Sequence, residues 1–477
     1  MDLEAVFLHI DENFDSYLGE IRSYLRQTGV STTGEGMEEA ADYTIGLIGR
    51  IGGDAELVET EGNPVVFGTI SSNDPNAKTL IASSLYDVVP ADSDDWITDP
   101  FGAEIVDSRD HPEVGWEVSA GDTLVGRGSR NQRGPNLAFM LALNSIKEAT
   151  GDLPVNVVFT FDGEEEIASP SWGEFLEKKQ DVLMTADAAY QHGFRQDENG
   201  RHMIHLGFKG VSLFELIVEG GEWGGTRDAS DLGPGDIIWV ESPALILMNA
   251  VLSLFDENGR CAIDGFWDNV AAVTPREGEL MGLIRDQFDE EAALRARNVS
   301  KFRTHKSAAE LYTEYCSAPI LNIDGLVSGY TTDAYTTVLP MRAVAKMDVR
   351  LVPDQTQEEF YEKLRAHLDK RGFDMVQIRR HGGVQPGKSN PDNPMVDAAV
   401  RATEHFGLDT QVWPISSAGN PLAFYARPPF SLPIMFAGTG FSSKSHMPNE
   451  WASVDGIKHS MKWIAVFLDE WARSSSD

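Results

Sequence analysis

Cysteine and long apolar runs are scarce in this sequence. The 477-residue chain has two cysteines, Cys261 and Cys316, too few for a disulfide framework, which predicts a reducing compartment. No stretch reaches the ~18 uninterrupted apolar residues that a membrane span needs. The N-terminal stretch has no basic segment ahead of an apolar one, so it predicts an acidic amphipathic helix and not a secretory signal. We therefore expect a cytoplasmic protein with no membrane partner.

Positive charge is also in short supply. The chain has 39 Lys and Arg against 75 Asp and Glu, a net charge of −36. A surface this negative repels phosphate backbones and anionic lipid headgroups, which excludes nucleic acid as an expected partner. The charges are interspersed and form no acidic tail, so we interpret them as a solubility device typical of a high-salt setting. Hydrophobic residues make up 42% of the chain, which is ample for about two or three packed domains.

Strand-like and helix-like segments alternate through the first two hundred residues. The sequence predicts a strand within 77–89, a helix over 134–149, a strand over 155–161, a helix over 171–183 and a strand over 182–190. Pro135 stands in the first turn of its predicted helix, where a missing N–H costs nothing. Such alternation predicts an α/β fold with a mostly parallel sheet and helices on both faces.

The pattern changes from about residue 206. Segments 210–220 and 338–354 alternate apolar and polar residues, and a helical pattern follows over 356–372. Antiparallel strands followed by a helix predict an α+β lid domain of the dimerisation type. We expect a catalytic α/β domain formed by residues 1–205 and 387–477, with the lid inserted as residues 206–386. The Pro- and Gly-rich stretch 382–394 is the expected return linker.

Polar residues cluster where the predicted strands end, which is where open α/β sheets bind ligands. The segments are 85–90, 126–134, 161–169, 185–193 and 438–450. The clearest signal is the run Glu164–Glu166 directly after an apolar strand. Adjacent carboxylates need a nearby cation, a shared proton or good solvation. One can hold a metal while its neighbour carries protons, although a run of three glutamates alone also fits a solvated turn.

Several motifs together resemble one known family. They are DVVPA with a following DPF, the GRGS…RG stretch, GEEEIAS, GFKG, RLVPD and HMPNE. On these motifs, across nearly the whole chain, the sequence resembles the M20 metallopeptidases, which include carnosine dipeptidases and aminoacylases. The long lid is similar to that of the carnosinase-like branch. The resemblance implies a two-metal hydrolase that cleaves C–N bonds in small molecules, and a homodimer formed through the lid.

The resemblance also implies roles for individual residues. Glu165 falls on the general base, and Glu166 falls on the metal ligand beside it. Asp187 falls on the second-site carboxylate, and His446 on the C-terminal imidazole. Asp87 falls on the acid that orients the first ligand histidine.

Three positions depart from the family pattern. Leu85 stands where the family has its first ligand histidine, Asn131 where it has the bridging aspartate, and Ala229 near the lid histidine. Two ions about 3.5–4 Å apart with no shared anion would repel each other strongly. We therefore predict at most one divalent ion, zinc or manganese. Its expected ligands are Glu166, His446, Asp187 and Asn131.

A metal-free site is the alternative. The guanidinium of Arg130 could lie where an ion would otherwise be and pair with an acidic side chain. Arg350 matches a lid arginine that in the family binds a substrate carboxylate, although a surface ion pair explains it equally well. Arg350 and Arg130 are thus the candidate substrate-binding residues. His192 could replace the lost imidazole, but we favour a structural role for it.

Three functions follow from these residues. The leading hypothesis is an M20-type hydrolase acting on a small carboxylate-bearing substrate, with Glu165 as general base. The second keeps the pocket but catalyses an elimination, a deamination or a ring opening, because a thinner metal site stabilises a tetrahedral intermediate less well. The third is a non-catalytic binding protein for small molecules.

Overall fold

The computed structural model describes residues 1–116, 121–226, 230–287, 289–296, 298–303, 306–333 and 335–475. The helices are α1 (Leu3–Leu25), α2 (Met37–Arg50), α3 (Arg133–Thr150), α4 (Trp172–Leu183), α5 (Pro243–Ser253), α6 (Pro275–Asp286), α7 (Glu290–Ala296), α8 (Ala308–Ser317), α9 (Gln357–Lys370), α10 (Pro394–His405) and α11 (Val454–Arg473). Across these ranges, no helix is both long enough and apolar enough to cross a bilayer.

The strands form a large central sheet, a lid sheet and two small sheets. They are β1 (Asp54–Val58), β2 (Val65–Ile70), β3 (Thr79–Leu85), β4 (Glu104–Asp107), β5 (Asp122–Val125), β6 (Asn156–Asp162), β7 (Ala188–His192), β8 (His202–His205), β9 (Gly207–Phe208), β10 (Gly210–Glu219), β11 (Ile320–Ser328), β12 (Arg342–Leu351), β13 (Gln377–Val384), β14 (Gly387–Lys388), β15 (Thr410–Trp413), β16 (Ile434–Ala437), β17 (Ser442–Ser443) and β18 (Trp451–Ser453).

The central sheet has eight strands in the order β1-β2-β6-β3-β7-β16-β8-β15. Its middle is parallel, because β3 pairs in parallel with both β6 and β7, and β7 pairs in parallel with β16. The edge strand β1 and its neighbour β2 run antiparallel. The prediction of a mostly parallel α/β sheet is confirmed, and the carboxyl ends of β3 and β6 meet at the same edge.

Helices cover both faces of the central sheet, as predicted. On one face α1, α3, α10 and α11 contribute to one apolar core with the sheet. On the other face α4 and the segment 421–434 form a second core. Pro135 does lie in the first turn of α3, and α11 buries its apolar side against the same core.

One predicted strand is displaced. The segment 182–190 was expected to be a strand, but α4 continues to Leu183 and β7 begins only at Ala188. The observed strand begins six residues later than predicted, which places Asp187 immediately before β7 and not within it.

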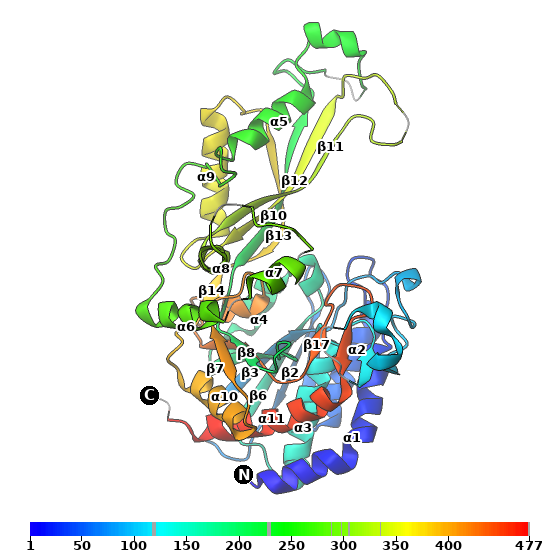
Figure 1. The fold of residues 1–477 in the computed structure, drawn as a ribbon, viewed down its shortest axis with the longest axis vertical. Helices are drawn as coiled ribbons and strands as arrows, with labels where there is room; N and C mark the ends of the chain where they lie inside the picture. Colours follow the sequence, from blue (N-terminus) through cyan, green and yellow to red (C-terminus); the bar gives the residue numbers. More distant parts are fainter. Residues whose placement is uncertain are drawn as a thin grey trace.

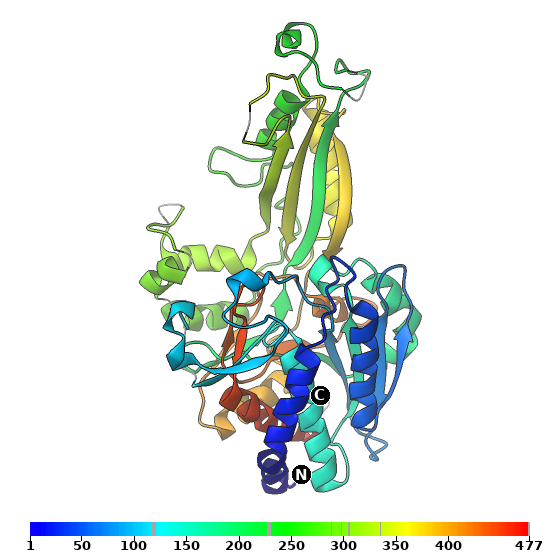
Figure 2. The same ribbon diagram turned by 90° about the vertical axis from the view of Figure 1, so that its right-hand side faces the viewer.

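The lid is a four-stranded antiparallel sheet in the order β11-β12-β10-β13. Helices α5 and α9 pack on one of its faces and share its apolar core. Figures 1 and 2 show this sheet projecting away from the central one, with both termini at the far end of the molecule. The short pair β9 and β14 stands at the two crossings between the domains. The domain limits at 205/206 and 386/387 stay a prediction.

A second small sheet, β17-β18-β5-β4, positions two loops next to each other. Strand β5 leads directly into the Gly- and Arg-rich loop 126–134, and the segment 444–450 leads into β18. Because β5 and β18 pair through Trp451 and Val125, these two loops lie side by side. This pairing brings together two motifs that are more than 300 residues apart in sequence.

Candidate active site

The carboxylate of Glu450 organises the loop 126–134. Glu450 is fully buried, and its Oε1 accepts hydrogen bonds from the backbone N–H of Arg130 at 3.0 Å and of Asn131 at 2.8 Å. Its Oε2 accepts one from Nη1 of Arg127 at 2.7 Å, in an ion pair in which both side chains are at most 3% exposed. A single carboxylate therefore fixes the direction in which Arg130 and Asn131 project.

The three arginines of this loop have different roles. Arg127 belongs to the buried ion pair, and the guanidinium of Arg133 donates to the carbonyl oxygens of Tyr86 and Gln27 inside the core. Only Arg130 of the three lines the cavity that borders Glu165. Arg130, a candidate substrate-binding residue from the sequence, thus lies at this cavity, and its role stays a prediction.

The turn that carries the glutamates begins where β6 ends. Glu164 faces inward, and its carboxylate accepts hydrogen bonds from the backbone N–H of Asn63 at 2.9 Å and of Ser171 at 3.1 Å. Gly163 lies so close to Tyr86 that an added Cβ would come within 2.3 Å of the phenol oxygen. The three glutamates are therefore not equivalent residues of a solvated turn. Glu164 is bound to the backbone inside the protein, whereas Glu165 and Glu166 have other surroundings.

Asp87 lies beneath this turn, after β3. It is completely buried, and its Oδ2 accepts the backbone N–H of Glu166 at 3.0 Å. Burial, together with the negative charges of Asp162 and Glu166, raises the pKa of Asp87 well above its ordinary value. The predicted orienting acid thus positions the backbone of Glu166. It does not orient a histidine, because the residue two positions earlier is the buried Leu85.

Glu165 is half-buried and lines the cavity. Burial raises its pKa well above the ordinary value of 4.5, and the nearby charges of Glu166, Asp87 and Asp162 raise it further. A carboxyl group with a raised pKa holds and releases a proton closer to neutrality, which is what general acid–base chemistry requires. The structure therefore places Glu165 at the cavity with a pKa suited to carrying a proton, and its catalytic role stays a prediction.

Glu166, His446 and Asn131 form a closed triangle. Nε2 of His446 lies 3.0 Å from Oε2 of Glu166, and Nδ2 of Asn131 donates to Oε1 of Glu166 at 2.7 Å. The same Asn131 nitrogen is 2.9 Å from Nε2 of His446. The hydrogen bond with Glu166 raises the pKa of His446. Three of the four predicted metal ligands are thus brought together.

The fourth predicted ligand, Asp187, is not at this site, so the ligand set is corrected here. Its Oδ2 accepts the backbone N–H of Thr79 at 2.8 Å, and its own N–H donates to the carbonyl of Thr79. Thr79 begins β3, whereas Glu166 and Asp87 follow the far ends of β6 and β3. Asp187 is exposed at the amino edge of the central sheet, a full strand length from the triangle.

These side chains do not fit a centre of two divalent ions. Among the described residues, no group of three or more His, Cys, Asp or Glu is placed to hold a metal. Leu85 offers no lone pair, the amide of Asn131 donates to a Glu166 oxygen that an ion would need, and Nε2 of His446 faces the same carboxylate. Glu166 supplies the only carboxylate of the triangle, which balances half the charge of one divalent ion.

The cavity beside the triangle has a volume of about 250 Å³. It is lined by the loop 130–132, Glu165, the segment 193–195, Ser416, the segment 418–420, and His446 with its neighbour Ser445. Ser416 and Gly419 are therefore at the cavity. Phe208 and Phe436 complete its walls, which come from several separate segments, as expected for a crevice at strand ends.

Other predicted residues lie elsewhere. Arg350 is on lid strand β12, where its Nε donates to Asp348 at 2.7 Å, and it does not line the cavity. This contact is the ion pair that the sequence left open as the alternative. Ala229 falls outside the described residues. His192 is a buried structural residue as predicted, held by Tyr190 and Ser460, and burial lowers its pKa to about 3.

The sequence alone did not point to two residues of this region, Glu450 and Arg195. Glu450 ends the HMPNE motif, but nothing in a lone glutamate shows that it caps a loop three hundred residues away. Arg195 lines the cavity and follows β7 by three residues. The rule that polar residues after a strand face the crevice would have found it, had the end of β7 been predicted at His192.

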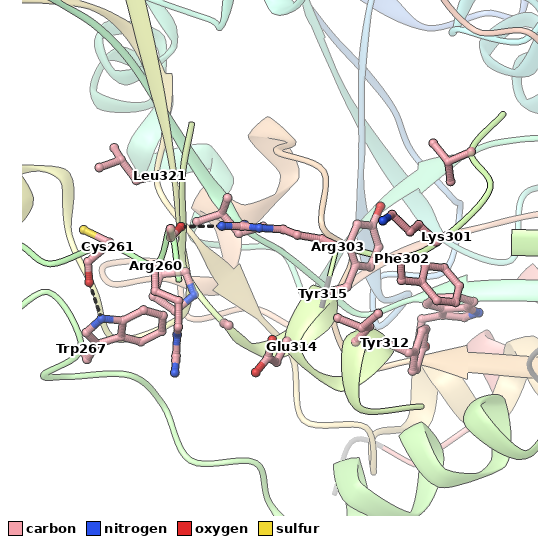
Figure 3. Close-up of a pocket in the computed structure, with 17 residues that line it drawn as sticks. Arg260, Cys261, Trp267, Lys301, Phe302, Arg303, Tyr312, Glu314, Tyr315 and Leu321 are labelled. Carbon is pink, nitrogen blue, oxygen red and sulfur yellow. Dashed lines mark hydrogen bonds between the residues drawn. The ribbon is translucent and has the colours of Figure 1, made fainter. Parts of the chain in front are cut away.

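A second, larger cavity is remote from these residues. It has a volume of about 680 Å³ and lies where the lid segment around α8 meets Trp413 of the central sheet. Figure 3 shows aromatic side chains such as Trp267, Tyr312 and Tyr315 on its walls, with the guanidinium of Arg303 directed toward a backbone carbonyl. Glu165 and the triangle do not border it, so we do not place the chemistry there.

Comparison with known proteins gives consistent matches. Residues 84–470 match the sequence model described as peptidase family M20/M25/M40. The Cys-Gly metallodipeptidase DUG1 of Saccharomyces cerevisiae is 25% identical over 422 residues, which cover 86% of this chain and 82% of that protein. The human Beta-Ala-His dipeptidase is 25% identical over 498 residues, which cover 98% of this chain and 92% of that protein.

Solved structures share the whole architecture. An M20 family metallo-carboxypeptidase from Sulfolobus solfataricus superimposes with a TM-score of 0.86 at 28% identity, covering 96% of this chain and 99% of that one. Human carnosine dipeptidase 1 has a TM-score of 0.78 at 23% identity, covering 99% of both chains. The second likeness shows the fold alone.

Proposed function

The chain belongs to peptidase family M20/M25/M40, and from that membership we propose that it hydrolyses a C–N bond of a small carboxylate-bearing molecule in the cavity beside Glu165. The family is one of peptide-bond hydrolases, and the relatives are named as dipeptidases. The observation that carries the proposal is the position of Glu165, half-buried at the cavity with a raised pKa. We propose a cytoplasmic enzyme with a small-molecule substrate.

Glu165 would take a proton from the attacking water and return it to the leaving amine. Its raised pKa suits both directions, since the carboxylate is a stronger base than an exposed glutamate and the acid is formed nearer to neutrality. Asp87 acts as a positioning group, because it holds the backbone N–H of Glu166 and thereby the turn on which Glu165 stands. Glu450 positions the facing loop in the same way.

We propose that the site holds at most one divalent ion, zinc or manganese, with Glu166 and His446 as its ligands. Two relatives carry the term metallo in their names, but the residues of this chain do not fit a two-ion centre. Asn131 would have to turn its carbonyl oxygen toward an ion, giving up both of its present contacts. The proposed proton transfer by Glu165 therefore does not depend on a bound ion.

The closed triangle of Glu166, His446 and Asn131 favours a second candidate function. With Glu166 already accepting from Asn131 and facing Nε2 of His446, a metal-free member of the family could use Glu165 as a base in an elimination, a deamination or a ring opening. Binding of a small molecule without turnover is the third candidate. Activity that survives a strong chelator would favour the second candidate, and binding without turnover would favour the third.

The test of the proposed function is the variant Glu165→Gln. We expect turnover of the best substrate in a panel of dipeptides and N-acyl amino acids to fall about 10²- to 10⁴-fold, the usual effect of a general acid–base group. The affinity for small carboxylates should stay within about twofold. Glu177→Gln is the matched control, because Glu177 is exposed on α4. Full activity of Glu165→Gln would refute the role assigned to this residue.

We also propose a homodimer formed through the lid. The edge strand β11 exposes Leu326 by 55% and Val327 by 50%, and an unpaired edge with apolar side chains favours pairing with another strand. Light scattering should give twice the chain mass for the native protein and a shift toward the monomer for Leu326→Lys. A native protein that is monomeric at all concentrations would contradict the proposal.

A further inference from the structure

Arg195 is a cation built into the cavity wall. It lies in the connection between β7 and β8, where its backbone N–H donates to Gly438 at 3.0 Å and its carbonyl accepts from Met203 at 2.8 Å. Its guanidinium stacks over the ring of Phe436, 4.7 Å from the centroid, and Nη2 is 3.2 Å from Nε2 of His205. These contacts on several sides hold the charge in one place.

The sequence around Arg195 is adapted to this arrangement. An added Cβ at Gly193 would come within 2.4 Å of the Phe436 ring, so only glycine at this position allows the ring to lie beneath the guanidinium. Burial, with Arg195 close by, lowers the pKa of His205 well below its ordinary value. The ring is therefore neutral and accepts from Arg195 without opposing its charge.

Nothing in the described chain neutralises Arg195. Among the residues that the structure describes, no carboxylate lies within ion-pair distance of its guanidinium, and its Nε is buried without a hydrogen-bond partner. The charged neighbour that bears on it is a second cation, Arg130, on the same cavity. Its pKa is lowered to about 9 by burial and by that neighbour, so it is still protonated at neutral pH.

A fixed, partly desolvated cation without a counter-ion is costly unless an anion completes the site. Two guanidiniums on one cavity add to this cost, because they repel each other when the cavity is empty. An anion between the two guanidiniums supplies the missing counter-ion and offsets their repulsion. It also gains charge-assisted hydrogen bonds in a fork geometry that matches a carboxylate.

We propose that Arg195 and Arg130 form a binding site for the carboxylate of a small organic acid, in the cavity that Glu165 borders. The identification of that acid as the substrate rests on the proposed function. Arg195 then binds the substrate carboxylate, the role expected of Arg350 from the sequence. Arg350 itself is ion-paired in the lid and does not line the cavity. In this chain, the fixed positive charge at the cavity comes from two side chains.

The shape of the cavity favours a small acid. Its volume of about 250 Å³ is below the roughly 300–1,000 Å³ of drug-sized ligand sites. Besides the two arginines it offers the hydroxyls of Ser416 and Ser445 and the amide of Gln132, whose buried Oε1 has no partner. These groups suit the polar remainder of an amide-containing acid.

The experiment is calorimetric titration of the full-length protein with N-acetylglycine, succinate, inorganic phosphate and the uncharged N-acetylglycinamide, at constant ionic strength because salt screens the attraction. We expect saturable binding of the two carboxylates and none of the uncharged amide. Arg195→Gln should weaken carboxylate binding at least tenfold, and Arg195→Lys should weaken it less. Arg401→Gln, which removes a cation paired with Glu470 on the protein surface, is the control and should bind as the native protein does.

Three results would overturn the proposal. They are carboxylate binding that is unchanged in a folded Arg195→Gln variant, no binding of either carboxylate to the native protein, and binding of phosphate alone. Circular dichroism and thermal melting show whether each variant is folded, and Arg195→Lys gives a second measurement if Arg195→Gln is not. Because the readout is binding, loss of this site and failure of Glu165 as the proton carrier are separate outcomes.

Discussion

Glu450→Gln should destabilise the catalytic domain more than its single-atom change implies. Glu450 is fully buried and accepts hydrogen bonds from Arg127 and from the backbone N–H groups of Gly128, Arg130 and Asn131. An amide in its place keeps one acceptor oxygen but turns an NH₂ donor toward other donors. It also leaves the guanidinium of Arg127 buried without its counter-ion.

Breaking a buried pair by removing one partner costs about 3–5 kcal/mol. Total stabilities of about 5–15 kcal/mol make this a large fraction. We expect the free energy of unfolding to fall by that amount, measured from urea transitions followed by tryptophan fluorescence. The transition that involves the catalytic domain is the relevant one, because a two-domain chain need not unfold in a single step.

Two further variants separate the ion pair from general damage. Glu470→Gln removes a partly exposed partner of Arg401 and should change the free energy by less than about 0.5 kcal/mol. The double variant Arg127→Met with Glu450→Leu removes both charges together, so it should lose less than the sum of the two single changes. A loss below about 1 kcal/mol for Glu450→Gln would show that Glu450 does not anchor the loop.

Three further predictions concern proton binding and packing. Turnover should rise with pH through an apparent pKa above 4.5, because Glu165 acts as the carboxylate and its pKa is raised. Glu166→Gln should shift this rise in the pH–rate profile to lower pH by removing a neighbouring charge. A rise centred on the ordinary glutamate pKa would contradict this role of Glu165. Burial raises the pKa of Asp162 from 3.8 to about 7, so the folded state takes up a proton in this window and its stability is lost as pH rises from about 4 to about 7. Asp162→Asn should flatten that decline in thermal melts, and an unchanged slope would exclude Asp162 as its source. Gly163→Ala must displace Tyr86 and should cost about 1–3 kcal/mol of stability, with a native-like melting temperature as the opposing result.

Most of the fold could be predicted because its elements have strong periodic signals. The β-branched run of β6 and the apolar helix α3 lie where the sequence placed them. The boundary between α4 and β7 was wrong because residues 182–190 carry apolar residues that satisfy either period. Tertiary packing decides such a segment, and Leu183 is buried in the core as the end of a helix.

The site was predictable in part. Glu165, Glu166, His446 and Asn131 were singled out by the family resemblance of their motifs, and the structure brings all four to one place. Asp187 was misplaced because β7 begins only at Ala188, which leaves Asp187 at the amino edge of the sheet beside Thr79.

The importance of Arg195 and Glu450 could not be predicted from the spacing of residues along the sequence. Arg195 matters because Phe436 and His205 hold it and no carboxylate of the described chain pairs with it, and these relations arise only once β7, β8 and β16 are side by side. Glu450 matters because β18 pairs with β5. Both residues act through long-range pairing that a single sequence does not display.

The most direct test is anomalous X-ray diffraction from crystals grown with zinc and with manganese, recorded at the absorption edge of each metal. A site built on Glu166, His446 and an amide predicts at most one anomalous peak per chain, between those two side chains, with the guanidiniums of Arg130 and Arg195 facing the cavity. Two fully occupied peaks about 3.5–4 Å apart would contradict it, because these residues offer no anion to bridge them.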